Sequence, residues 1–69
     1  MRFALTNLDN GLFFAKGGWT AEGGLAQMFS DTDTVALAAI KHNIKNAAAA
    51  MIGGEPPHAR GFLWVTKPK

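Results

Sequence analysis

The chain has 69 residues, of which 48% are hydrophobic and 17% are charged. This length predicts one domain, residues 1–69, and this composition excludes a disordered, highly charged chain. The chain contains no cysteine, which excludes disulfide scaffolds and every zinc or iron–sulfur site built on thiolates. The formal net charge is +2 at pH 7, a mild basic excess.

No segment predicts a signal peptide or a membrane span. The apolar residues near the start are interrupted by Thr6 and Asn7, too early for a signal peptide. The longest weakly polar segment, residues 35–52, carries Lys41 and Lys45 in its middle, whereas a membrane helix needs about 20 apolar residues. We therefore expect a cytoplasmic protein without a membrane partner, and the lack of cysteine agrees with a reducing compartment.

A hairpin is predicted at the start of the chain. Residues 2–8 alternate as a strand does, and residues 12–16 form the returning strand. Between them lies Asp9-Asn10-Gly11, in which Asn and Gly tolerate the positive φ angles of tight turns. This turn is the strongest local signal in the chain.

Two registers of this hairpin compete: a two-residue turn pairs Leu8 with Phe13, and a three-residue turn pairs Leu8 with Leu12. The first register groups on one face Phe3, Leu5, Leu12 and Phe14. The second, with a left-handed Gly11, groups on one face Phe3, Leu5, Phe13 and Ala15. We prefer the second register, because it sends the charge of Lys16 to the other face.

A glycine-rich segment follows at residues 17–24. Its two Gly pairs exclude a stable helix or a central strand, so we interpret it as a loop with Trp19 as its only large anchor. Residues 25–29 are ambiguous, since they predict either one helical turn or a short strand.

A long amphipathic helix is predicted from Asp31 to Ile52. Ser30 can cap its first turn, and Asp33 stands where a capping box places an acidic residue. Gly53-Gly54 ends the helix and Pro56-Pro57 prevents its continuation. Its apolar face is formed by Leu37, Ile40, Ile44, Ala47, Ala48 and Met51.

The last strand is predicted at residues 62–66, after a connector at residues 55–61. It is apolar on both faces, which suits a central strand or one covered by another chain, and we place it beside the first strand. The element order is therefore ββ(β)αβ. It predicts an α+β fold in which a small antiparallel sheet of three or four strands, the N-terminal hairpin plus the C-terminal strand, packs against one long amphipathic helix.

Residues with catalytic or metal-binding chemistry are scarce. The chain has two His, no Tyr and no Cys, and Ser30 is its only Ser. A hydrolytic zinc site needs three protein ligands, and His42 is expected in the middle of the helix, away from His58. We therefore expect a non-catalytic protein that has no metal and no cofactor.

Self-association is the function that the sequence favours. One helix cannot cover both faces of the predicted sheet, and a contiguous exposed apolar patch usually marks an interface. We expect a symmetric homodimer formed through the outer sheet face or an edge strand. The candidate interface residues are Leu8, Leu12, Phe14, Trp19, Phe62 and Trp64. The alternative is a monomer whose glycine-rich loop folds back and places Trp19 over that face.

Weak nucleic-acid binding is the alternative function. It would use the helix flank and the C-terminal tail, through Lys41, Lys45, Arg60, Lys67 and Lys69. A solvated helix face and a solubilising tail explain the same residues, and a nucleic-acid footprint is usually denser. A third interpretation is a small-molecule site under the glycine-rich loop near Trp19.

One pattern runs through the first half of the chain: Phe3-x-Leu5-x-Asn7, Gly11-Leu12-Phe13, Trp19-Thr20 and Ala26-x-x-Phe29-x-Asp31. It resembles the pattern of small uncharacterised bacterial and prophage-type proteins, in which a strand ends in Asn and Ala-x-x-Phe precedes a helix. The resemblance implies a compact α+β domain. It implies no established activity, so it assigns no functional residue.

Overall fold

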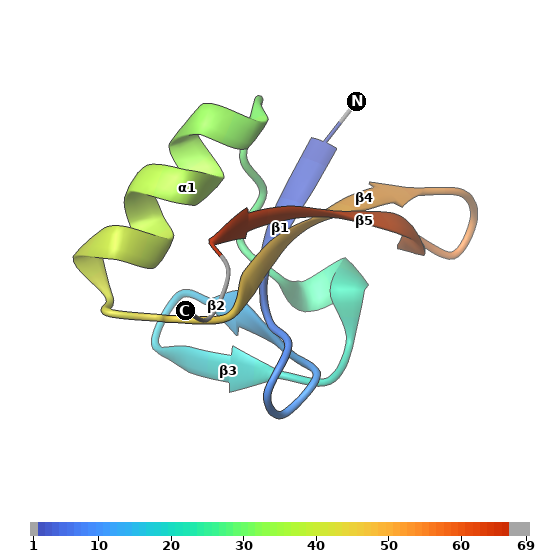
Figure 1. Cartoon of the computed structure of the whole chain (residues 1–69). Coiled ribbons are helices and arrows are strands. Elements are labelled where there is room, and N and C mark those ends of the chain that lie inside the picture. Colours follow the sequence, from blue (N-terminus) through green and yellow to red (C-terminus); the bar gives the residue numbers. More distant parts are fainter. Residues whose placement is uncertain (1, 67–69) are drawn as a thin grey trace.

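A five-stranded antiparallel sheet carries one helix on one of its faces (Figure 1). The structure is a computed structural model and describes residues 2–66. The elements in chain order are β1 (Arg2–Asn7), β2 (Leu12–Ala15), β3 (Gly18–Thr20), the 3-10 turn η1 (Gly23–Leu25), α1 (Thr32–Lys41), β4 (Ala47–Gly53) and β5 (His58–Thr66). The strand order in the sheet is β3-β2-β1-β4-β5. Among the described residues, no helix is long and apolar enough to cross a membrane.

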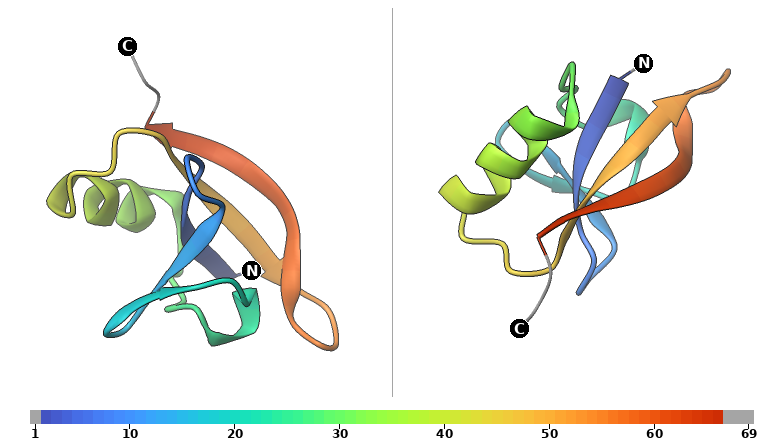
Figure 2. Two further views of the ribbon diagram at one scale, coloured as in Figure 1. Left: turned by 90° about the horizontal axis from the view of Figure 1, so that it is seen from below. Right: turned by 45° about the horizontal axis from the view of Figure 1, so that its top comes forward.

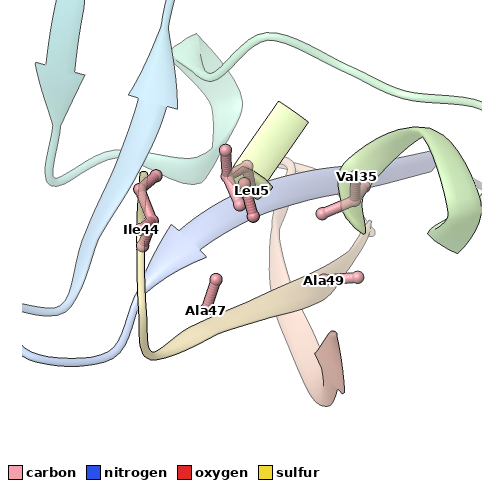
Figure 3. Packing of buried hydrophobic residues seen from close by; sticks show 6 residues of the cluster. Leu5, Val35, Ile44, Ala47 and Ala49 are labelled. Atoms are coloured by element: carbon pink, nitrogen blue, oxygen red, sulfur yellow. The ribbon is translucent and has the colours of Figure 1, made fainter. Parts of the chain in front are cut away.

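Both faces of the sheet contribute to the core. On the helix side, Leu5 of β1 and Ala47 and Ala49 of β4 pack with Val35 of α1 and with Ile44 (Figure 3). The opposite face has its own cluster, formed by Ala4, Phe13, Ala26, Ala50 and Ile52. Figure 2 shows that β4 and β5 curve away from β2 and β3, with η1 on the open side between them. The segment after β3 therefore covers part of the face that α1 leaves bare.

The helix is much shorter than the sequence predicted. It ends at Lys41, and the run Ala47–Ala50, expected to be helical, forms the first part of β4. Asn43 adopts a positive φ of 58°, and the amide of Ile44 turns back to donate to the carbonyl of Ala39 at 2.9 Å. The helical preference of alanine is weak compared with tertiary packing. Here the alanines are buried on both faces of a central strand, where larger side chains would hold the layers apart.

The predicted apolar face of the helix was also wrong. Val35 and Ala39 are the helix residues buried against the sheet, whereas Leu37 is 66% and Ile40 68% exposed. Val35 and Ala39 are four residues apart and share one face of the helix, whereas the turn of about 100° per residue directs Leu37 and Ile40 away from that face.

The first turn of α1 is capped by Asp31 and not by Ser30. Asp31 is extended, and its Oδ1 accepts a hydrogen bond from the backbone N–H of Thr34 at 2.8 Å. The Thr34 hydroxyl also donates to this carboxylate, at 2.9 Å. These hydrogen bonds, the backbone bond first, hold the pKa of Asp31 below its ordinary value of 3.8.

The N-terminal hairpin is confirmed, but neither predicted register is observed. Asn7 pairs with Leu12 and Thr6 with Phe13, so the loop spans residues 8–11. The Asn7 carbonyl accepts the N–H of Gly11, whose φ is 73°, at 2.8 Å. This register differs from the two-residue turn by two residues, and a shift of two keeps every side chain on its face. Leu5 and Phe14 therefore lie on the helix side, whereas the preferred register placed Phe13 there.

Two strands lie where the sequence predicted a loop and a helix. Gly18–Thr20 forms β3 at one edge of the sheet and pairs with β2, and β4 replaces the second half of the predicted helix. The sheet therefore has five strands and not three or four. The left-handed φ angles of Gly17 and Gly18, 91° and 154°, make the turn into β3.

The ambiguous residues 25–29 and the last strand are also resolved. Leu25 ends η1, and Phe29 makes a single antiparallel bridge to Phe3. β5 begins at His58, earlier than predicted, and pairs with β4 and not with β1. It is an edge strand, although its apolar sequence suited a central one.

A larger residue in the alanine run of β4 is expected to separate the layers of this fold. Ala49→Leu should lower the free energy of unfolding by about 1–3 kcal/mol, because the side chain enters a filled core beneath α1. Urea denaturation measures this change. Ala21→Leu, at an exposed position, is the matched control and should change stability by less than about 0.5 kcal/mol. Equal stability of the two variants would contradict the packing described.

The cap at Asp31 should make helix stability depend on pH. Because its pKa is lowered on folding, the stabilisation is present above pH 3.8 and is lost as the pH falls through the lowered pKa. Asp31→Ala should therefore have a lower Tm than the unmodified chain at pH 7, and the gap should narrow below pH 3.8. Thermal melts followed by circular dichroism measure this. Asp31→Ser, which keeps a capping oxygen, should retain most of the Tm; a pH-independent gap would contradict the assignment.

Candidate functional site

An apolar surface lies along β4 and β5, on the sheet face opposite α1. Strand pairing places Trp64 beside Ala48 and Phe62 beside Ala50. Phe62 is 52% and Trp64 is 60% exposed, although both belong to a nine-residue strand. With Leu8, which follows β1, they surround a hollow of about 250 Å³ whose floor is Ala48. We call Leu8, Ala48, Phe62 and Trp64 the β5 surface.

The small side chains of β4 create this hollow. Side chains of neighbouring strands stand side by side on a sheet face, so an alanine between larger residues leaves a depression. Ala48 lies in such a row, between Thr6 of β1 and Trp64 of β5. The depression is therefore a consequence of the small side chain of Ala48 on this face of β4.

Asn46 holds Trp64 and the β1–β2 loop in fixed positions. The Trp64 indole Nε1 donates to Asn46 Oδ1 at 3.1 Å, and Asn46 Nδ2 donates to Asp9 Oδ1 at 3.2 Å. The backbone carbonyl of Asn46 also accepts the N–H of Leu8 at 2.9 Å. Asn46 thus joins Trp64 to the β1–β2 loop and fixes the orientation of the indole ring.

The end of β5 is tied to the start of β4 by Thr66. Its hydroxyl accepts the N–H of Ala47 at 3.0 Å and donates to the carbonyl of Ile44 at 3.1 Å. The register shifts beside this point, where Ala47 pairs with Thr66 but Ala48 pairs with Trp64. These hydrogen bonds fix the register at the end of β5, and this register places the Trp64 side chain on the face opposite α1.

The structure places the remaining predicted interface residues elsewhere. Phe14 packs in the helix-side cluster, and Leu12 stands on the same side of the sheet because the two residues are separated by two along β2. Trp19 of β3 pairs with Phe14 of β2, and the two rings meet edge to face with 5.7 Å between their centroids. His42 also packs against Phe14, at 4.7 Å between ring centroids. These aromatic residues form a cluster separate from the β5 surface.

In the monomeric alternative, the glycine-rich segment folds back and places Trp19 over the sheet face, whereas here the residues that follow the segment cover part of that face without Trp19. Ala26 and Met28, which follow this segment, pack against Ala4 and Ile52 on the face opposite α1. Trp19 does not cover that face, since it lies against Phe14. The covered region ends before the β5 surface, which stays exposed.

Leu63 is an exposed apolar residue that the candidate residues did not include. It is 48% exposed and pairs with Ala49, so it stands on the helix side of β5. The signal for it was the uninterrupted apolar run at residues 62–65, which indicated a strand apolar on both faces. The structure adds that this strand is at an edge.

The predicted basic residues do not form one patch in the described structure. Lys41 ends α1 and Lys45 precedes β4, whereas Arg60 lies in β5 beside the far end of β4. A strand of seven residues separates these positions by about 20 Å. Lys67 and Lys69 lie outside the described residues.

The hollow nearest to the glycine-rich segment has a volume of about 590 Å³ and lies between η1 and the turn that precedes β5. Its ionisable lining residues are Glu22 and His58, and Trp19 does not line it. His58 Nδ1 donates to the carbonyl of Pro56 at 2.9 Å, because a carbonyl oxygen can only accept. In the described part of the chain, no group of three or more His, Cys, Asp or Glu residues could hold a metal ion.

Comparisons with protein-family models, with curated proteins and with solved structures find no match for this chain. The resemblance to small bacterial and prophage-type proteins therefore stays a prediction. Any function must be inferred from the geometry of the β5 surface.

A buried hydroxyl without a hydrogen-bond partner lies beside the β5 surface, on the strand next to Ala48. Within residues 2–66, Thr6 Oγ1 is buried and has no hydrogen-bond partner, and Thr6 stands between Phe13 and Ala48 in the sheet. Thr6→Val has the same shape without the hydroxyl and should raise the free energy of unfolding by about 1 kcal/mol. Urea denaturation tests this. Thr20→Val is the control and should not gain stability, because the hydroxyl that it removes accepts a hydrogen bond from the N–H of Glu22. A destabilised Thr6→Val would show that the hydroxyl has a partner in solution.

Proposed function

We propose that this protein is a non-catalytic, cytoplasmic interaction module that binds a second copy of itself through the β5 surface. The observation that carries the proposal is the exposure of Phe62 and Trp64, each more than half open to solvent beside buried alanines. Large apolar side chains gathered around a hollow are typical of protein interfaces, in which aromatic residues supply much of the binding energy.

The β5 surface also has the preorganisation that an interface needs. Asn46 holds the Trp64 ring by a hydrogen bond of 3.1 Å and anchors Leu8 through its backbone carbonyl. A side chain that is oriented before binding loses less conformational entropy when the partner arrives. The surface is small, so the association should be weak and concentration dependent.

The described structure supports self-association more than nucleic-acid binding. A nucleic-acid surface needs several cations along one track, but Lys41 and Lys45 lie at the opposite end of β4 from Arg60. Nucleic-acid binding stays the alternative prediction. It would appear as an affinity that falls steeply with salt concentration.

A charge placed on the β5 surface should prevent self-association. Sedimentation velocity of the unmodified chain, from micromolar to millimolar concentration, should show a mass that rises to that of a dimer. Phe62→Lys should shift the dissociation constant upward by at least tenfold, because it places an unpaired charge within an apolar contact between the two copies.

Leu37→Lys is the matched control, since Leu37 is also more than half exposed but lies on the outer side of α1. It should associate as the unmodified chain does, and circular dichroism should show both variants folded. A monomeric unmodified chain at millimolar concentration would overturn the proposal, as would equal weakening by the two variants.

A further inference from the structure

The open edge of the sheet at β5 has the properties of a pairing strand. β5 is nine residues long and is the last strand in the sheet order, and within residues 2–66 no strand lies on its outer side. Natural edge strands are protected by prolines, by several charges or by short length. Residues 58–66 contain no proline, and Arg60 is their only Lys, Arg, Asp or Glu.

The part of this edge that can accept another strand is its second half. The ladder with β4 is regular from Gly61 to Trp64 and shifts on either side. At the start of β5, Gly23 of η1 lies so close that a Cβ there would stand 3.7 Å from the Ala59 nitrogen. The neighbourhood of Ala59 is therefore occupied, whereas the segment from Gly61 onward projects beyond η1.

We propose that two copies pair antiparallel through β5, with Leu63 opposite Leu63 of the second copy, so that the two sheets become one continuous sheet. This inference rests on the proposed function and specifies how its partner binds. A two-fold axis perpendicular to the sheet keeps each face on its own side, so directly opposed residues must have the same side-chain direction. Residue 62 then faces residue 64 of the second copy.

This register joins apolar groups on both faces. On the face opposite α1, Phe62 of each copy stands opposite Trp64 of the other, which extends the β5 surface across the axis. On the helix side, the Leu63 side chains meet each other, and Val65, which packs against the helix-side cluster, lies beside them. Aromatic pairs and apolar pairs directly across strands are the contacts that stabilise a sheet.

Symmetry also allows the neighbouring registers centred on Trp64 and on Phe62. Centring the pair on Trp64 places Phe62 opposite Thr66, which separates the two aromatic residues and removes the leucine pair. Centring the pair on Phe62 places the charged Arg60 opposite Trp64 and Gly61 opposite Leu63, which removes the leucine pair. It also brings His58 opposite Thr66, so that the second copy extends over the segment next to Gly23. The occupied start of β5 and the distribution of apolar residues therefore both favour the register centred on Leu63.

The area of the contact indicates a weak dimer. Phe62 and Trp64 together expose on the order of 200 Å² per copy, since aromatic side chains bury about 150–250 Å² each. Pairing side by side on one face of a continuous sheet covers only part of this area. Stable interfaces bury about 800 Å² per partner. The apolar area here is smaller, so much of the binding free energy must come from backbone hydrogen bonds along the edge and from the Leu63 pair. A second copy fits this edge, because residues 62–64 of one copy place apolar side chains directly opposite the apolar side chains of residues 62–64 of the other.

A single introduced cysteine tests the register, because the chain has no cysteine of its own. In an antiparallel pair, directly opposed Cα atoms are about 4.5–5.5 Å apart, within the roughly 4.4–6.8 Å range of disulfides. Leu63→Cys should therefore form a cross-linked dimer under mild oxidation at least tenfold faster than Phe62→Cys. The two copies of position 62 are offset along the strands and lie about 8 Å apart, too far for a disulfide. Leu37→Cys, on the outer side of α1, reports random collision.

The outcomes separate this inference from the proposed function. Rapid cross-linking of Leu63→Cys alone, measured by non-reducing electrophoresis, supports the register. If the unmodified chain sediments as a dimer but Leu63→Cys cross-links no faster than Phe62→Cys, edge pairing centred on Leu63 is wrong while self-association stands. If the unmodified chain is monomeric at millimolar concentration and no variant exceeds Leu37→Cys, both are wrong.

Discussion

The close approach of two layers over the alanines of β4 is the constraint on which the rest of the structure depends. Ala47 and Ala49 lie under α1, while Ala48 and Ala50 face the other side of the sheet, and all are buried. These small side chains allow α1 on one face, and Ala26 and Met28 on the other, to approach the sheet at the packing density of a protein interior. The helix residues that are buried against this strand are Val35 and Ala39.

Several large apolar residues lie outside this contact. Leu37 and Ile40 lie on the sides of α1 turned away from Val35 and Ala39 and are exposed to solvent. On the other face, the alanines leave a depression that Phe62 and Trp64 border but do not fill. A domain of this size buries a limited share of its surface, so its aromatic residues at an edge strand are available for contacts with another molecule.

The candidate site thus combines a small residue of the sheet, Ala48, with large apolar residues whose positions neighbouring polar groups hold. Asn46 lies between the end of α1 and the start of β4, and its side chain and carbonyl hold Trp64 and Leu8 in place. Thr66 satisfies two backbone groups at the same end of the sheet. These polar contacts are local, yet they orient an apolar surface to which residues from three separate strands or their borders contribute.

The sequence by itself determined the α+β class, the N-terminal hairpin, the start of the helix within one residue and the excess of apolar side chains at residues 62–65. These features depend on local signals: a turn with Asn and Gly, a capping acid and alternation along a strand. It could not determine that residues 47–50 form a strand, because alanine favours a helix locally and only burial between two layers reverses that preference. Nor could it bring Leu8, Phe62 and Trp64 together or separate them from Phe14 and Trp19. Those positions follow from strand order and register, which long-range pairing decides and no short segment of the chain encodes.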